Sequence, residues 1–220
     1  MTEVFDKRAK AILQNFSVFN NGLVFKKGDT QRTIAESEDV YVRATFGNFP
    51  KDFAVADLGK FLGILSLYND PKVSVNDKTL TLKSGGQVFH YTLASPDVIK
   101  QPDEAGDPTL TNELVEFNLT EDELEQASRN IQVGKLPEVA FFANKKKVSL
   151  IGFDSKMPTG DVYSVELVDT DKSFNIIFNA HKILSLLDGD YKVTLSEGIA
   201  RFVGKDIVYY IASEENSKYA

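Results

Sequence analysis

The chain has 220 residues, of which 42% are hydrophobic and 26% are charged, so it has the composition of an ordinary globular protein. Its formal net charge of −7 and its pI near 5.0 argue against a protein that coats nucleic acid with its whole surface, but they permit a locally basic surface. The absence of cysteine excludes disulfides, thiolate metal sites and cysteine nucleophiles. No apolar run approaches the roughly 18 to 20 residues of a membrane span and no signal core opens the chain, so we expect a soluble intracellular protein.

The first half of the chain predicts two helices and several strands. The first helix is indicated by an apolar stripe at i, i+4, i+7, i+8 and i+11, formed by Phe5, Ala9, Ile12, Leu13 and Phe16. Strand-like runs follow at 17–25, 31–35 and 40–46. A second helix has Leu58, Phe61, Leu62 and Leu65 on one side, and further strands are expected at 72–75, 80–83 and 88–93.

The second half repeats this order. A helix over 119–132 begins with Thr120 and Glu123 at the spacing of a capping box, and its apolar face is formed by Leu124, Ala127, Ser128 and Ile131. Strands are expected at 138–143, 147–153, 162–168 and 174–178. A fourth helix with Ala180, Ile183, Leu184 and Leu187 on one face precedes strands at 191–195, 199–203 and 207–212.

The repetition indicates an internal duplication. The letters ILSL occur at 64–67 and again at 183–186; the offset is 183 − 64 = 119 there and 193 − 73 = 120 between Val73 and Val193. Residues 94–113 hold three prolines and no sustained periodicity, which is typical of a linker. We therefore predict an N-terminal domain at 1–95, a connector at 96–112 and a C-terminal domain at 113–220. The alternative is one continuous mixed domain with a long loop.

Motifs that carry catalysis are missing. The sequence has no glycine-rich phosphate loop, no dinucleotide fingerprint and no zinc-protease helix motif. His181, Ser185 and Asp188 suggest a triad, but they lie within one helical segment and not on the strained turn of a nucleophile elbow. His90 is expected to be a structural or surface residue of a strand. An enzyme is therefore the weaker hypothesis.

Basic residues stand opposite the apolar stripe of each expected helix. They are Lys7 and Lys10 with Arg8 at the border of the first face, Lys60, Arg129, and Lys182 with His181 at the edge. Each base alone is most simply a solvated surface residue. Four duplicated helices side by side would instead present a row of positive side chains that contacts DNA phosphates without reading the base sequence.

Four segments, "ILQNFSVFNNGLVFK" (12–26), "FLGILSLYND" (61–70), "SRNIQ" (128–132) and "FNIIFN" (174–179), closely resemble the sliding clamps, or DNA polymerase processivity factors, of T-even-type bacteriophages. "FLGILSLYND" is the most specific of them, and the resemblance runs along nearly the whole chain. It implies an α+β DNA-clamp fold of two duplicated domains, each with two helices packed on antiparallel sheets. Clamps of this family assemble as homotrimeric rings around duplex DNA.

The resemblance also implies partners and site residues. It implies no enzymatic activity and no cofactor, a DNA polymerase that binds by a C-terminal peptide, an ATP-driven clamp loader, proteins of late transcription, and the cytoplasm of an infected bacterial host. The DNA-facing residues that it implies are Lys7, Arg8, Lys10, Lys60, Arg129, His181 and Lys182. The implied partner-peptide pocket contains Val98, Ile99, Tyr210 and Ile211.

The third helix departs from this pattern, because it begins with Glu121, Asp122, Glu123 and Glu125. The helix dipole favours acidic residues at a helix N-terminus. Here they predict either that the second domain contributes less positive charge to the surface that faces DNA, or that this segment points to the outer rim of the ring or to a subunit boundary. The rival from another class is a phage structural or scaffold protein with no role on DNA.

Overall fold

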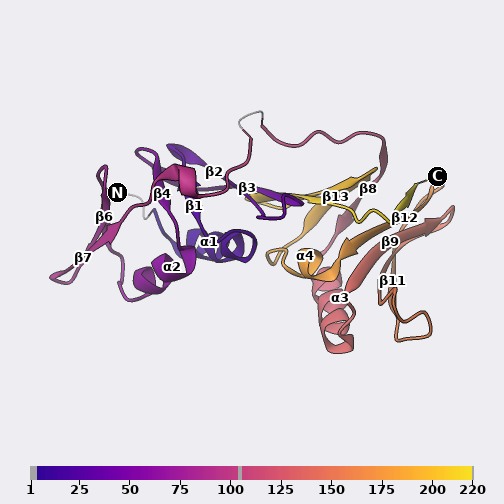
Figure 1. The fold of residues 1–220 in the computed structure, drawn as a ribbon. Helices are drawn as coiled ribbons and strands as arrows, with labels where there is room; N and C mark the ends of the chain where they lie inside the picture. The colour runs from indigo at the N-terminus through magenta and orange to yellow at the C-terminus, as the bar shows by residue number, and fades with distance from the viewer. Residues whose placement is uncertain (1–3, 104–105, 220) are drawn as a thin grey trace. The chain divides into compact units, whose positions relative to one another are not determined.

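A computed structural model describes residues 4–103 and 106–219 of the chain. It divides into two compact units, unit 1 (Met1–Asp107) and unit 2 (Pro108–Ala220). Each unit contains a helix, four strands, a second helix and three strands in that order, and neighbouring strands within each unit pair antiparallel (Figure 1). The predicted α+β class with two helices per half is confirmed.

The described residues of unit 1 form two helices and seven short to medium strands. Its elements are α1 (Lys7–Phe19), β1 (Leu23–Phe25), β2 (Gly28–Ile34), β3 (Val40–Phe49), β4 (Phe53–Val55), α2 (Leu58–Ser66), β5 (Lys72–Val75), β6 (Thr79–Ser84) and β7 (Gln87–Thr92). β1 pairs with β4, β2 pairs with β3, and β6 lies between β5 and β7. A 3-10 turn (Pro96–Val98) follows in the connector.

Unit 2 has longer strands. Its elements are β8 (Glu113–Leu119), α3 (Glu121–Gly134), β9 (Glu138–Asn144), β10 (Lys147–Phe153), β11 (Tyr163–Asp169), β12 (Ser173–Asn179), α4 (Ala180–Leu184), β13 (Tyr191–Ser196), β14 (Ile199–Val203), β15 (Ile207–Ala212) and β16 (Lys218–Tyr219). One sheet has the order β11-β10-β9-β12-β16, and β8, β13, β14 and β15 pair in that order in another.

The core of unit 1 is built around phenylalanine rings. Phe25 stacks on Phe53 with ring centroids 4.5 Å apart, and Phe49 lies 4.9 Å from Phe25. Phe5 and Phe61 are 5.4 Å apart, which joins the approach to α1 with α2. Burial of such rings and their edge-to-face contacts stabilise the packing of both helices on the strands. The apolar stripes predicted for the first two helices are therefore largely the faces that the core uses.

The ends of α1 and α3 follow local sequence signals. The Asp6 carboxylate accepts a hydrogen bond from the Ala9 N–H (2.7 Å), so α1 begins at Lys7. At α3, Thr120 and Glu123 form the predicted capping box. α3 ends at Lys135, which adopts the left-handed conformation (φ 52°, ψ 39°).

Two local predictions are wrong. Residues 17–19 belong to α1 and not to a strand, because Phe19 continues the buried stripe of Ile12 and Phe16 for another turn; the strand is only β1. α4 has only five residues, and Leu186 is buried in place of the expected Leu184 and Leu187.

The early end of α4 has a tertiary cause. The Leu187 N–H donates a hydrogen bond to the Tyr209 hydroxyl (3.1 Å), and the Tyr191 hydroxyl donates to the Leu187 carbonyl. These two side chains come from the following strands and satisfy backbone groups that a longer helix would pair internally. The spacing of apolar residues within the helix therefore does not predict where α4 ends.

Candidate nucleic-acid interface

The outer faces of α1 and α2 in unit 1 carry exposed positive charge. Lys7 and Lys60 are exposed, and Lys10 and Arg8 are half-buried. Among the described residues, Lys7, Lys10 and Lys60 form no ion pair. The nearest acids in sequence, Asp6 and Asp57, cap the helices instead, and Asp57 accepts from the Lys60 N–H at 2.7 Å.

The predicted bases of unit 2 are compensated. The Arg129 guanidinium pairs with Glu125 one helical turn earlier, and Lys182 Nζ lies 3.1 Å from Glu214 Oε1. α3 itself carries four acids and one base, and its first-turn acids face solvent or cap the helix. The sequence indicated correctly which helices are basic or acidic, but only the structure shows which positive charges are balanced by carboxylates.

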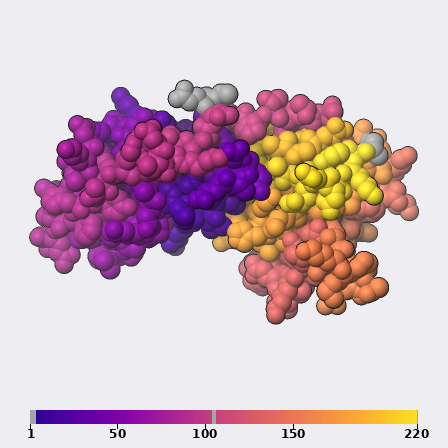
Figure 2. Space-filling model, in the orientation of Figure 1, coloured from indigo at the N-terminus to yellow at the C-terminus, as the bar shows by residue number. Residues whose placement is uncertain are grey.

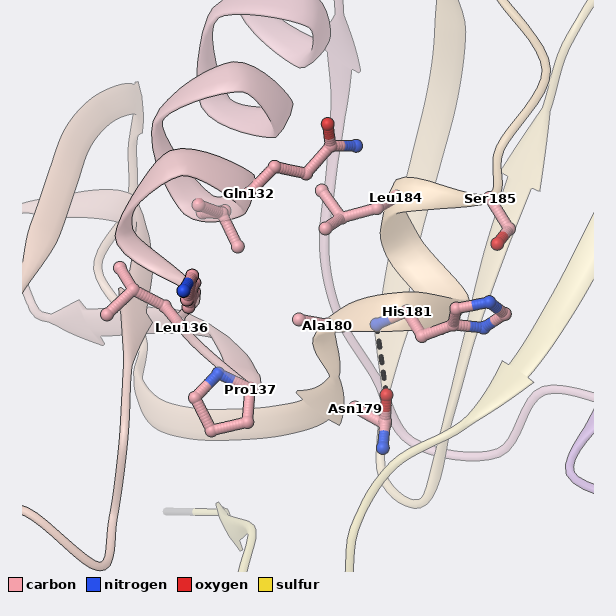
Figure 3. A pocket seen from close by; sticks show the side chains of 10 residues that line it. Gln132, Leu136, Pro137, Asn179, Ala180, His181, Leu184 and Ser185 are labelled. Carbon is pink, nitrogen blue, oxygen red and sulfur yellow. Dashed lines mark hydrogen bonds between the residues drawn. The ribbon is translucent and has the colours of Figure 1, made fainter.

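A cleft of about 450 Å³ separates the end of α3 from α4 (Figure 3). α3 packs on β10 and β11, and α4 packs on β9 and β12 of the same sheet (Figure 1). The lining residues are Ile131, Gln132, Lys135, Leu136, Pro137, Asn179, Ala180, His181, Leu184 and Ser185. In Figure 3, Gln132 extends from α3 toward Leu184, and the Asn179 side chain accepts the His181 N–H (2.9 Å).

This cleft holds two members of the triad that the sequence suggested. Ser185 is the C-cap residue of α4, with φ −92° and ψ 3°, and His181 lies one turn before it. Neither stands on a strained strand-to-helix turn, which is what an activated serine requires. His90 is exposed in β7, with Nδ1 2.9 Å from the Thr81 hydroxyl, in agreement with a structural role.

The connector is fixed to unit 1. The Asn20 side chain donates to the carbonyls of Lys100 (2.9 Å) and Ile34 (3.0 Å). Arg43 Nε lies 2.9 Å from Asp107 Oδ2. Ile99 packs on the buried Val24 and Ala54. In the space-filling view the part of the connector before residue 104 forms part of the surface of unit 1 (Figure 2).

The four residues named for a partner pocket differ in exposure. Val98 is 71% exposed, whereas Ile99, Tyr210 and Ile211 are 8%, 6% and 0% exposed. Only Val98 therefore presents its side chain to solvent in this structure. A cleft of about 270 Å³, which no sequence signal indicated, lies beside the connector, and its lining residues are Val24, Lys26, Thr30, Arg32, Gln101, Pro102 and Asp103.

Other kinds of site receive little support. Over residues 4–103 and 106–219, no group of three or more His, Asp or Glu side chains is arranged to hold a metal ion. In the same ranges, no helix has the length and apolarity that a membrane crossing requires.

Solved structures show which fold this chain has. The chain is similar to proliferating cell nuclear antigen (PCNA) of A. fulgidus, in a complex described as the C-terminal region of FEN-1 bound to that PCNA, with a TM-score of 0.69, 14% identity, and 95% and 96% of the two chains covered. It is also similar to PCNA of Entamoeba histolytica, with a TM-score of 0.68, 13% identity, and 93% and 94% covered. The fold is thus the DNA-clamp fold that the resemblance implied.

Sequence comparisons narrow this class. The family model described as "gp45 sliding clamp, C terminal" matches residues 116–215. The sliding clamp of Enterobacteria phage T4 is 28% identical over 97% of both chains, and that of Vibrio phage KVP40 is 27% identical over 95% of this chain and 98% of its own. The chain is therefore similar along nearly its whole length to the sliding clamps of these phages, and the predicted resemblance is confirmed. These comparisons support a non-catalytic DNA sliding clamp.

Proposed function

We propose that the chain assembles as a homotrimeric ring around duplex DNA and tethers a DNA polymerase to its template. The proposed DNA contact is supported by three lysines on α1 and α2 that form no ion pair with any described residue. They are Lys7, Lys10 and Lys60. They stand on an acidic chain of net charge −7. Surface lysines that form no ion pair attract phosphates without reading bases, which permits sliding. Arg8, Arg129, His181 and Lys182 are the further proposed DNA-facing residues.

Strand edges support an assembly of identical copies. β7 is an edge strand of the β5-β6-β7 sheet, and β11 is an edge strand of the five-stranded sheet. Each edge has an exposed valine: Val88 (50%) lies within β7, and Val162 (63%) directly precedes β11. Open edges pair readily with another strand, so we propose that β7 of one copy continues the sheet of β11 of the next.

The partner peptide is proposed to bind beside the connector. Val98 offers an apolar contact, and the cleft next to Pro102 has an apolar wall at Val24 with Lys26 and Arg32 nearby. Ile99 contributes by holding the connector in place. Tyr210 and Ile211 stay predictions, and because their side chains are buried, any contribution comes through the packing of β15.

In a ring that encircles DNA, a weak contact with the polymerase peptide is sufficient for processive synthesis. Once the ring encircles DNA, the bound polymerase stays at high effective concentration near the primer end. Processivity therefore does not require the ring to bind the template tightly. The proposed partners further include an ATP-driven clamp loader and late-transcription proteins. The proposed site of action is the cytoplasm of the infected bacterial host.

Two experiments test this function. Light scattering after size exclusion is expected to give 3 × 24.5 = 73.5 kDa. Replacing Val88 and Val162 with glutamate is expected to give the monomer mass, because a charge at each edge prevents pairing while both sites are exposed in the single chain. A concentrated wild-type protein that stays monomeric would remove the ring and the sliding mechanism.

The charge assignment is tested with a matched control. The triple variant Lys7→Gln, Lys10→Gln, Lys60→Gln is expected to weaken binding to a fluorescent 30-base-pair duplex and to reduce the salt slope by about 0.9 for each phosphate that is no longer neutralised. The control replaces Lys26, Lys51 and Lys100, which pair with Asp52, Asp77 and Glu38, with glutamine. Both variants have a net charge of −7 − 3 = −10, so equal weakening would show a general charge effect and contradict the assignment.

A further inference from the structure

We propose that unit 2 contains a docking cleft for an extended basic segment of a partner protein, at the position that the connector fills in unit 1. The cleft has a volume of about 620 Å³ and is lined by Glu138 of β9, residues 154–156 after β10, and residues 214–216 after β15. We call it the exit cleft. The inference goes beyond the proposed function, which assigns neither DNA nor the polymerase peptide to this cleft.

The chain leaves the last strand of each unit in the same way. In unit 1 the Ala94 N–H donates a hydrogen bond to the Ala54 carbonyl of β4 (3.0 Å). In unit 2 the Glu214 N–H donates to the Ile177 carbonyl of β12 (2.7 Å). Both donors lie two residues after the last strand, β7 or β15, and both acceptors lie in the strand that precedes the second helix. The two exits are therefore at equivalent positions of the duplicated units.

In unit 1 the connector fills the space beyond this exit. Ile99 packs on Val24 and Ala54, which are paired with one another across β1 and β4. Ile99 also covers Gly22, where an added Cβ would lie 3.0 Å from Ile99 Cγ1, so a larger residue at that position would disturb the contact. The start of β1 therefore accepts an extended segment of chain, which here is the connector.

In unit 2 the same space is open. The chain pairs as β16 with the first residues of β12, which lie beside the end of β9, so it does not return over the start of β9. Ala140 and Ile177, the pair that corresponds to the two residues under Ile99, are buried. Glu138, which corresponds to Gly22, instead lines the exit cleft. The duplicated position is therefore filled by the chain itself in unit 1 and is an open cleft in unit 2.

The charges of the exit cleft favour a basic occupant. Its lining residues carry four carboxylates and one ammonium group, which are those of Glu138, Asp154, Glu214, Glu215 and Lys156. Lys182 pairs with Glu214, and the other three carboxylates form no ion pair with any described residue. Three negative charges against one positive charge attract a lysine or arginine side chain and disfavour an acidic segment.

The connector indicates the pattern of the partner segment. In unit 1 the basic Lys100 directly follows the apolar Ile99 and forms an ion pair with Glu38, which lies between β2 and β3. In unit 2, Asp154 lies in the corresponding segment between β10 and β11 and lines the exit cleft. We therefore expect the partner segment to have an apolar residue followed by a lysine or an arginine.

A peptide taken from the connector tests this pattern. The probe is labelled with fluorescein and contains residues 98–102 of this chain, VIKQP, between glycines, and the comparison peptide has glutamate in place of the lysine. In fluorescence anisotropy at low salt, the lysine peptide is expected to bind the wild type at least about tenfold more tightly than the glutamate peptide. Equal affinities, or no binding of either peptide at about 1 mM protein, would overturn the proposal.

Two variants locate the contact, each with a matched control. Glu215→Lys should weaken binding of the lysine peptide at least about threefold, and Lys156→Glu should strengthen it by a similar factor. The controls Asp171→Lys and Lys172→Glu make the same charge changes between β11 and β12, do not line the exit cleft, and should leave binding unchanged. All four side chains are exposed, so every variant should keep the wild-type Tm. Equal effects of the variants and their controls would contradict a contact at the cleft.

Two further results would assign the binding elsewhere. If Glu38→Lys abolishes binding of the lysine peptide and Glu215→Lys does not, the peptide displaces the connector in unit 1, and the proposal is wrong. If Glu215→Lys lowers the mass of the concentrated protein, measured by light scattering, the exit cleft is a contact between copies of this chain. That outcome would also overturn the proposal of a partner protein.

Discussion

In unit 1, α1 and α2 pack against one another and present lysines that lack ion-pair partners among the described residues, whereas in unit 2 a cleft lies between α3 and α4, and Arg129 and Lys182 are paired with carboxylates. The two units nevertheless share one element order. A duplicated core tolerates little change because close-packed interiors respond to single methylene groups, while surface charges vary at small cost. The comparison predicts that the two units contribute unequally to the proposed DNA contact.

The units also differ in how their strands pair. β1 and β4 pair over three residues, but β9 and β12, which hold the corresponding places, pair over seven. In return, unit 1 has the denser group of phenylalanine rings around Phe49. We interpret this as two ways to stabilise one topology, by aromatic packing in unit 1 and by longer strand ladders in unit 2.

The largest expected effect is the removal of a core ring. Phe49 contacts the rings of Phe5, Phe25, Phe46 and Phe53, the nearest centroid lying at 4.9 Å, whereas Phe202 lies 6.3 and 6.4 Å from the rings of Phe141 and Tyr191. Phe49→Ala should cost about 3–5 kcal/mol, and Phe202→Ala should fall at the lower end of that range. Urea unfolding followed by circular dichroism measures both losses of stability. A larger destabilisation by Phe202→Ala would contradict the interpretation that aromatic packing stabilises unit 1 more than unit 2.

A smaller effect is expected where α3 approaches its sheet. A Cβ at Gly152 of β10 would lie 2.7 Å from Ile131 Cγ1, so Gly152→Ala must displace the Ile131 side chain or α3 itself and should cost about 1–3 kcal/mol. The control Gly63→Ala on the exposed face of α2 meets no atom within 4 Å and should instead stabilise by about 0.5–1 kcal/mol. Thermal unfolding of the two variants in opposite directions is the expected result.

Alkaline pH should weaken unit 1. Burial, and then the hydrogen bond to Asp107, raise the pKa of Tyr41 well above its usual range. Because the folded pKa exceeds the unfolded value of about 10, this contribution is complete below about pH 10 and is lost as the pH rises through the folded pKa.

The variant Tyr41→Phe isolates this contribution. It should lose about 1 kcal/mol at about pH 8 through the missing hydrogen bond of 2.9 Å to Asp107. The difference from the wild type should shrink as the pH rises from about 9 to about 11, measured by urea unfolding at each pH. A difference that is constant over this range would show that the Tyr41 proton has no part in stability. Tyr163→Phe in unit 2 is the control, since burial raises the pKa of Tyr163 without a contribution from a carboxylate.

The smallest expected effect tests the charge balance directly. Glu125→Gln with Glu214→Gln removes the carboxylates that pair with Arg129 and Lys182, and it should strengthen binding of the 30-base-pair duplex a few-fold at low salt. The cost in stability should stay below about 1 kcal/mol, because exposed ion pairs contribute little. The control Glu166→Gln releases Lys147 on β10 and should leave DNA binding unchanged. Unchanged binding in the double variant would mean that these two carboxylates do not weaken the contact of unit 2 with DNA.

Much of the fold was predictable from periodicity and caps. The stripe of Ile12 and Phe16 and the box of Thr120 and Glu123 are local signals, because they depend on neighbours within one or two turns. The duplication follows from the repeated order of such signals. The end of α4 was not predictable, since it depends on Tyr191 and Tyr209 from later strands.

The candidate site was predictable only in part. The sequence indicated which helices carry bases, and Lys7, Lys10 and Lys60 are indeed without ion pairs in the described part of the chain. It did not show that Glu214 compensates Lys182, because 32 residues separate them. It also did not reveal the cleft beside residues 101–103.

The sequence by itself determined the duplicated order of elements and most of the residues that face the core, because these depend on spacing along the chain. The clamp class came from the resemblance of its segments to known sliding clamps. The tertiary structure decided which surface charges are paired, where α4 ends, and which residues line the clefts of each unit. These depend on distances between residues that lie far apart in the chain, and spacing along the sequence does not contain those distances.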